Sequence, residues 1–138
     1  MSQTHKNKTF TTLLAFLLGG VGAHRFYLRG AGDKWAWLHV ASVPACAAVA
    51  LAAPQADRFY QLLPLIVSVL LGCLQALVLG LMSDEKWDAA YNGGSGRQSD
   101  STWPLALILV LTLAIGVGGT IAAMARLFDL MYTGGAYG

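Results

Sequence analysis

The sequence predicts an all-α membrane protein, a bundle of four transmembrane helices with a short interfacial amphipathic helix between the third and the fourth. Apolar residues make up 56% of the 138 residues and charged residues 12%, a balance far more apolar than that of soluble domains. No charged residue occurs at positions 59–83 or 101–125, and each stretch is 25 residues long. About 20 apolar residues suffice for a helix to cross the hydrocarbon core.

Four apolar segments follow one another along the chain, and each predicts one span. They cover approximately residues 10–28, 35–53, 59–82 and 103–126. The first contains an apolar run of only 14 residues, which rises about 21 Å as a helix, so we extend it through the polar residues that follow. The turn between the second and third segments has five residues, which predicts a tight hairpin. Pro104 suits the first turn of the fourth helix.

The first segment has a second interpretation, as a secretory signal peptide. Lys6 and Lys8 would form its basic region, residues 10–20 its apolar core, and residues 21–23 a small-residue cleavage site. Four spans place both termini on one side of the membrane. Lysines and arginines then number four on the termini's side and five on the other, which does not decide the orientation. The two lysines of the N-terminal tail, unopposed by acids, favour cytoplasmic termini.

Residues 84–91 predict the interfacial helix. Ser83 is placed to cap it, acids fill its first turn, and Trp87 and Tyr91 share one side. This pattern is typical of a helix that lies in the headgroup region. Residues 93–102 follow as a linker, whose first half is rich in glycine and polar residues and is expected to be mobile.

Small residues recur at helical spacing in all four segments. In lipid the hydrophobic effect does not hold helices together, so close approach at small residues is a main source of cohesion. The simpler explanation is that alanine and glycine are common in membrane helices. The expected helix-packing residues are Ala41, Ala45, Ala48 and Ala52 on the second segment, Gly72, Ala76 and Gly80 on the third, and Gly118 on the fourth. The ladders of the second and third segments are expected to be contact faces of the hairpin.

The densest group of functional side chains is the signature loop His24, Arg25, Phe26 and Tyr27 at the end of the first segment. Arg25 either snorkels to the headgroups as a plain anchor or lies below them, bonded to carbonyls, Tyr27 or an acid such as Asp33.

Two polar residues, His39 and Gln75, fall inside the second and third spans. A polar side chain at that depth needs a hydrogen-bond partner, and Gln75 or Arg25 could serve His39. An interhelical bond that only holds the bundle together is the simpler interpretation.

Two motifs resemble the TM-two domain family of small membrane proteins. The string LLAFLLGGVGAHRFYLRG follows Lys6-Asn7-Lys8, and LMSDEKWDAAYN lies downstream; together they place a TM-two-like domain at residues 6–92, with an additional helix at 103–126. The chain departs from the family at Arg29, where glycine is usual, and at Gln75, where glutamate is frequent. The resemblance implies a multi-pass protein of a bacterial cytoplasmic (inner) membrane with no known enzymatic activity.

Several function classes find no support in the sequence. The net charge of +2 is small and scattered, so nucleic acid is not an expected partner. The histidines lack ligand spacing and the two cysteines fall inside spans, so no metal, cofactor or disulfide framework is expected. No nucleophile–base or carboxylate pair stands at useful spacing, so we do not expect an enzyme.

The sequence therefore favours a non-enzymatic protein of the lipid bilayer that acts by helix association, as a homo-oligomer or with another membrane protein. The alternative is a small oligomeric pore or transporter lined by His39, Gln75 and Arg25. A charged residue deep inside a span would be more typical of a transporter, and the second to fourth segments have none.

Overall fold

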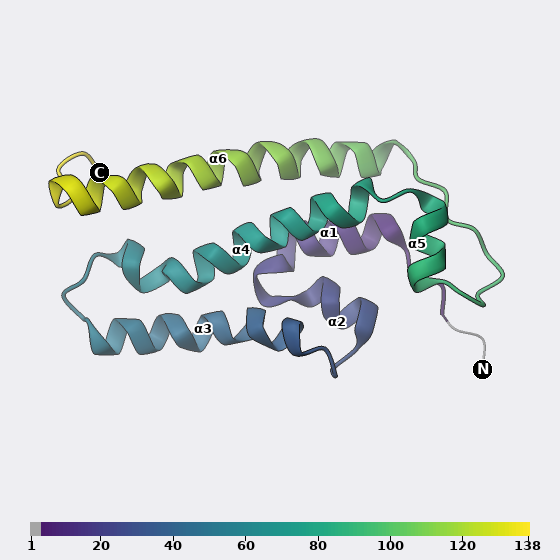
Figure 1. The fold of residues 1–138 in the computed structure, drawn as a ribbon, viewed down its shortest axis with the longest axis horizontal. Helices are drawn as coiled ribbons and strands as arrows, with labels where there is room; N and C mark the ends of the chain where they lie inside the picture. The colour runs from purple at the N-terminus through teal and green to yellow at the C-terminus, as the bar shows by residue number, and fades with distance from the viewer. Residues whose placement is uncertain (1–3) are drawn as a thin grey trace.

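The computed structural model describes residues 4–138, and within them every regular element is helical. The elements are α1 (Lys8–Leu18), the 3-10 turn η1 (Gly19–Val21), α2 (Ala23–Arg29), α3 (Lys34–Ala52), α4 (Arg58–Leu81), α5 (Asp84–Tyr91) and α6 (Trp103–Thr133). The long helices lie along one axis, and α5 covers the end of the molecule where the chain starts (Figure 1). Three helices, α3, α4 and α6, are long and apolar enough to cross a membrane.

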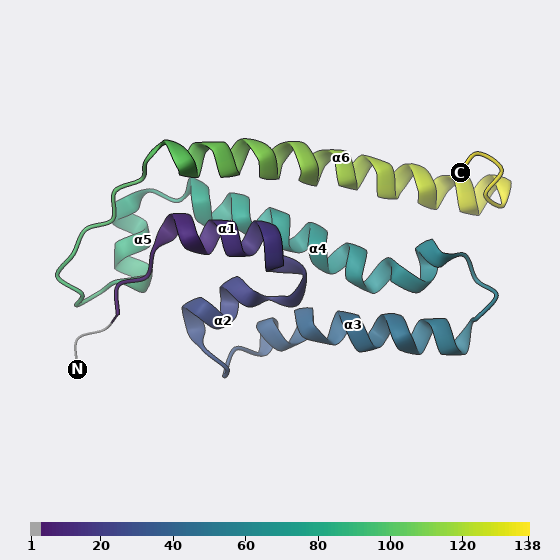
Figure 2. The same ribbon diagram turned by 180° about the vertical axis from the view of Figure 1, so that it is seen from behind.

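The first apolar segment is not the continuous helix expected over residues 10–28. Gly22, between η1 and α2, has φ +73°, a conformation that favours glycine. A Cβ there would also lie 2.9 Å from the Ala36 carbonyl oxygen. After this turn α2 runs back toward the end where α1 begins (Figures 1 and 2). The segment is therefore a helical hairpin, and the expected count of four spans is not confirmed.

The central helix is α4, which contacts α1, η1, α3 and α6. Its ladder of Gly72, Ala76 and Gly80 is buried. A Cβ on Gly72 would lie 2.7 Å from the backbone of Gly19, and one on Gly80 would lie 3.0 Å from Thr12. The α4 ladder thus packs against α1 and η1, with backbones in the close contact that small residues allow in lipid.

The expected partner ladder on α3 is mostly exposed and does not pack against the α4 ladder, although Ala41 and Ala45 line a cavity between the two helices. Ala41, Ala48 and Ala52 are exposed and Ala45 is half-buried, whereas α3 buries Ala36, His39 and Ser42. The prediction that the two ladders meet across the hairpin was wrong. Helical spacing marks a face of a helix, but it does not say which neighbour covers that face.

Helix α6 continues beyond Arg126, which was expected to mark its end, as far as Thr133. Its 31 residues extend about 46 Å, well beyond the roughly 30 Å hydrocarbon core. Arg126 pairs with Asp129 of the same helix at 2.7 Å and with Asp57, the N-cap of α4, at 2.9 Å. These ion pairs join the far ends of α4 and α6.

Helix α5 has the bounds that the sequence predicts, but Trp87 does not face headgroups. The Trp87 side chain is fully buried, and its indole N–H donates to the Lys6 carbonyl oxygen at 3.0 Å. The linker after α5 is also held in place, because the backbone N–H groups of Ser99 and Ser101 donate to Asp88 and Asp84. Helix α5 therefore fastens the N-terminal segment and the linker to one end of the bundle.

Candidate functional site

The hairpin turn brings polar residues from four elements together inside the bundle. His24 lies on α2, His39 on α3, and Ser68 and Gln75 lie two turns apart on one face of α4. The carbonyl oxygen of Gly20 on η1 completes the group. We call these five residues the polar chain. His39 and Gln75, singled out from the sequence as intramembrane polar residues, are both members.

The polar chain is a continuous run of directed hydrogen bonds. His24 Nε2 donates to Gln75 Oε1 at 2.5 Å, and Gln75 Nε2 donates to His39 Nε2 at 3.2 Å. His39 Nδ1 donates to Ser68 Oγ at 2.7 Å, and that hydroxyl donates to the Gly20 carbonyl oxygen at 2.7 Å. His39 is therefore a neutral imidazole with its proton on Nδ1.

Gln75 suits its place in the polar chain because an amide both accepts and donates. It accepts from His24 and donates to His39. An ionised glutamate at this position could only accept. The departure from the family pattern at Gln75 thus fits the hydrogen bonding of this chain.

One ring nitrogen of His24 makes no hydrogen bond within the described residues. The residue is 1% exposed, and its Nδ1 has no hydrogen-bond partner among residues 4–138. Buried polar atoms without partners are rare in native proteins. The pairing of His24 in this site is therefore made through Nε2 alone.

Arg25 is held by Asp33, one of the partners expected for it. Its Nε donates to Asp33 Oδ2 at 2.9 Å and its Nη2 donates to Oδ1 at 3.3 Å. The same carboxylate caps α3 by accepting from Trp35 N. Burial opposes ionisation of Asp33, but the hydrogen bonds from Arg25 and from the Trp35 backbone, together with the charges of Arg25 and Arg29, outweigh it and hold the pKa of the carboxyl below its usual value.

The two aromatic residues of the signature loop pack away from the polar chain. Phe26 makes an edge contact with Trp37 of α3 at 5.3 Å between ring centroids. Tyr27 makes a similar contact with Phe10 of α1 at 5.2 Å, and its hydroxyl accepts from Asn7 N. These contacts attach α2 to its two neighbours, so the signature loop combines anchoring residues with polar ones.

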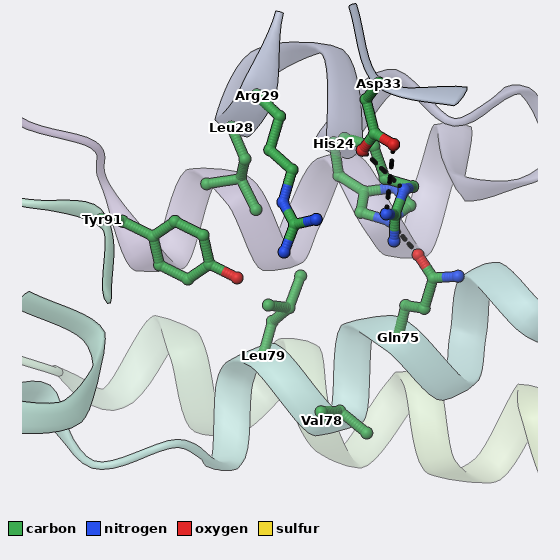
Figure 3. Close-up of a pocket in the computed structure, with 9 residues that line it drawn as sticks. His24, Leu28, Arg29, Asp33, Gln75, Val78, Leu79 and Tyr91 are labelled. Atoms are coloured by element: carbon green, nitrogen blue, oxygen red, sulfur yellow. Dashed lines mark hydrogen bonds and ion pairs between the residues drawn. The ribbon is translucent and has the colours of Figure 1, made fainter. Parts of the chain in front are cut away.

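A cavity of about 140 Å³ lies between α2, α4 and α5 (Figure 3). The residues that line it are His24, Arg25, Leu28, Arg29, Asp33, Gln75, Val78, Leu79 and Tyr91. We call it the boundary cavity. Tyr91, expected from the sequence to be interfacial, lines it beside Arg29, the residue at which the chain departs from the family pattern.

A second cavity of about 500 Å³ lies between α3 and α4. It is lined mainly by apolar residues, together with His39, Ser42, Ser68 and Gln75. Gln75 lines both cavities, so the polar chain separates them.

Sequence reasoning missed Ser68 as a member of the site. Its spacing of seven residues from Gln75 places both on one helix face, which is a signal that could have identified it. No group of three or more His, Cys, Asp or Glu side chains within residues 4–138 is arranged to hold a metal ion. Cys46 and Cys73 are free thiols.

Comparison with known families gives one result. The family model of the TM2 domain matches residues 4–51, which contain the signature loop and His39. The remainder of the domain expected from the sequence, residues 52–92, lies outside the match. No curated protein and no solved structure matches the chain.

Proposed function

We propose that the chain, whose residues 4–51 match the family model of the TM2 domain, is a non-enzymatic integral membrane protein that acts by helix association, with itself or with a membrane partner. The family and the three long apolar helices support a membrane location. The association rests on one observation, which is that the bundle leaves a small-residue face of α6 uncovered.

Helix α6 carries small residues on two faces. Toward the bundle, a Cβ on Gly116 would lie 3.2 Å from Cys73, and one on Gly119 would lie 3.3 Å from Leu70. On the other face Ala114, Gly118 and Ala122 are exposed, and a Cβ on Gly118 would meet nothing within 4 Å. A second transmembrane helix could approach this face closely, as at other small-xxx-small contacts.

A matched pair of variants tests the association. Gly118→Leu adds bulk to the open face, and Val117→Leu adds the same side chain at the neighbouring exposed position. Energy transfer between labelled copies in liposomes of decreasing protein density measures self-association. We expect Gly118→Leu to weaken self-association and Val117→Leu to leave it unchanged. Equal effects would contradict the role of this face, and a monomer at every density would rule out the homo-oligomer.

The fold supports three spans, α3, α4 and α6, with the α1–α2 hairpin entering the membrane and leaving on the same side. Irregular backbone at membrane depth is tolerated only where protein buries it, and Gly19, Gly20 and Gly22 at the turn are all buried. This arrangement puts seven of the nine basic residues at the end where the chain starts. They are Lys6, Lys8, Arg25, Arg29, Lys34, Lys86 and Arg97, against Arg58 and Arg126 at the far end.

An excess of lysine and arginine marks the cytoplasmic side of a membrane protein. The N-terminus, α5 and the boundary cavity would therefore face the cytoplasm, and the C-terminus would lie on the opposite side. The resemblance of residues 81–92 to bacterial family members supports the bacterial inner membrane as the location. In that setting α5 lies at the cytoplasmic membrane surface.

A pore or transporter is the second candidate function. The observation that favours it is that Gln75 lines two cavities, one on each side of the polar chain. A liposome flux assay with the purified protein tests it, with Gln75→Leu as the variant. Passage of ions or protons that Gln75→Leu alters would favour transport. No flux above that of empty liposomes would leave helix association as the function.

A further inference from the structure

We propose that the boundary cavity binds a phosphate group, presented by an anionic lipid headgroup or as free phosphate. Two polar side chains that line it, Arg29 and Tyr91, make no side-chain hydrogen bond or ion pair within residues 4–138. Arg29 comes from α2 and Tyr91 from α5, and both side chains point into the same space (Figure 3). His24 is buried at the opposite end of the cavity, beside Gln75.

The charge of the cavity favours an anion. Arg25 and Asp33 also line it, but they neutralise each other through two hydrogen bonds. The guanidinium of Arg29 is the remaining charge. Arginine is especially suited to phosphate because its planar N–H donors match two phosphate oxygens. The Tyr91 hydroxyl adds a neutral donor beside it.

His24 is not a phosphate ligand in this arrangement, because its Nε2 is bonded to Gln75 and its Nδ1 is enclosed by protein. The ligand class is therefore set by Arg29 and Tyr91. It is a phosphate group, such as inorganic phosphate or the phosphate of a phosphatidylglycerol headgroup.

The size of the cavity agrees with this class. A volume of about 140 Å³ corresponds to roughly five water molecules. Pockets for drug-sized ligands hold about 300 Å³ or more, so a nucleotide would not fit. The position also agrees, because the cavity lies at the end of the bundle where α2 carries its two arginines, and phosphates of lipids lie at the membrane boundary.

The test uses the full chain in phosphatidylcholine nanodiscs. In one arm phosphatidylglycerol replaces part of the lipid, and in the other inorganic phosphate is added to the buffer. The readouts are the shift in unfolding temperature and the amount of ligand that gives half of it. Binding in the first arm only identifies a lipid headgroup, and binding in the second identifies free phosphate. Either result supports the proposal, and binding in neither arm overturns it.

Variants show whether the cavity is the site. Arg29→Gln removes the charge that has no ion-pair partner. We expect it to weaken binding about tenfold or more, because one charge-assisted hydrogen bond to the phosphate is lost. Tyr91→Phe removes only the hydroxyl and keeps the ring against Trp87, and it should weaken binding a few-fold. Lys34→Gln is the control, since Lys34 is exposed at the same end but does not line the cavity.

The proposal stands if Arg29→Gln loses clearly more affinity than Lys34→Gln and Tyr91→Phe also loses affinity. Any other pattern overturns it, because equal effects of the two charge variants would mean diffuse attraction to a basic surface. Each variant is first compared with the parent without ligand. Arg29 is exposed and makes no ion pair among the described residues, so its replacement should not disturb the fold.

Discussion

Arg25 meets Asp33 through both Nε and Nη2, and this geometry distinguishes it from a simple membrane anchor. A lysine keeps the charge but cannot present a fork of donors. We expect Arg25→Lys to lower the free energy of unfolding by about 1.5–3 kcal/mol, the range for a hydrogen bond to a charged group. Arg29→Lys is the control, because Arg29 has no ion-pair partner within residues 4–138. Chemical denaturation in detergent measures both, and an Arg25→Lys protein as stable as the parent would leave Arg25 as a topology anchor only.

Gln75 links two histidines, so its replacement breaks two interhelical hydrogen bonds at once. Such bonds contribute roughly 0.6 kcal/mol each on average in membrane proteins, and we expect Gln75→Leu to cost about 1–2 kcal/mol. Gln75→Glu should also destabilise the protein, because an ionised carboxylate cannot donate to neutral His39. Thr120→Val is the control, since Thr120 is exposed and bonds only to the Gly116 carbonyl of its own helix. A Gln75→Leu protein no less stable than Thr120→Val would mean that the polar chain adds nothing to stability.

At this scale the sequence identified residues but not most of their partners. Arg25, His39 and Gln75 could be recognised because polar groups at membrane depth require hydrogen bonds. Their pairing depends on the turn at Gly22, which brings His24 back beside α4. A turn made by one glycine with positive φ leaves no periodic signal in the sequence.

Among the elements, η1 and α4 approach each other closely through the backbones of Gly19 and Gly72. We expect Gly72→Ala to destabilise the protein by about 1–3 kcal/mol, the usual cost of overpacking, because the new Cβ would lie 2.7 Å from the Gly19 backbone. Gly118→Ala is the matched control, with open space around the added methyl group. It should be neutral or stabilising, since alanine favours helix. Thermal unfolding in detergent compares the pair, and equal losses would contradict the packing described here.

Helix α5 depends on Asp88 for its connection to the linker. The carboxylate accepts hydrogen bonds from Asn92 and Ser99, which lower its pKa to about 2 from an ordinary 3.8. Because the folded pKa is below the unfolded one, this stabilisation is complete above about pH 4 and is lost as the pH falls toward 2. We expect hydrogen exchange of residues 84–101 to rise over that range. Asp88→Asn should raise exchange already at neutral pH, and Glu85→Gln, at an exposed position, should not.

Element bounds followed from sequence where apolar runs were long. The bounds of α3 and α4 differ by one residue at each end from those expected, and α5 matches. The prediction of a span over the first segment was not confirmed. It extended a run of 14 apolar residues through the polar residues that follow, whereas the chain turns back at that point. The α3 ladder does not meet the α4 ladder, because spacing within one helix cannot reveal which neighbour covers it.

At the scale of the whole molecule, the hairpin changes how many lysines and arginines lie on each side of the membrane. With four spans, Arg25, Arg29 and Lys34 lie opposite Lys6 and Lys8, and the numbers nearly balance. With a hairpin that returns to its own side, these residues join the N-terminal lysines and the asymmetry becomes clear. Orientation could not be derived from sequence because it required the path of the first segment.

Single cysteines in a background without Cys46 and Cys73 test this topology. The positions are Thr4→Cys, Gly32→Cys in the α2–α3 loop, Gln55→Cys in the α3–α4 turn and Ala136→Cys near the C-terminus. A membrane-impermeant maleimide added to intact spheroplasts should label positions 55 and 136, because three spans and a hairpin place these two positions outside the cytoplasm. Positions 4 and 32 should be labelled only after permeabilisation.

The decisive comparison is between positions 4 and 32. A hairpin puts them on the same side of the membrane whatever the overall orientation, whereas a first span over residues 10–28 puts them on opposite sides. Labelling of position 32 but not of position 4 in intact spheroplasts would therefore refute the hairpin and restore four spans. Labelling of both, with 55 and 136 protected, would keep the hairpin and invert the orientation, so the basic residues would then face outward against the usual charge bias.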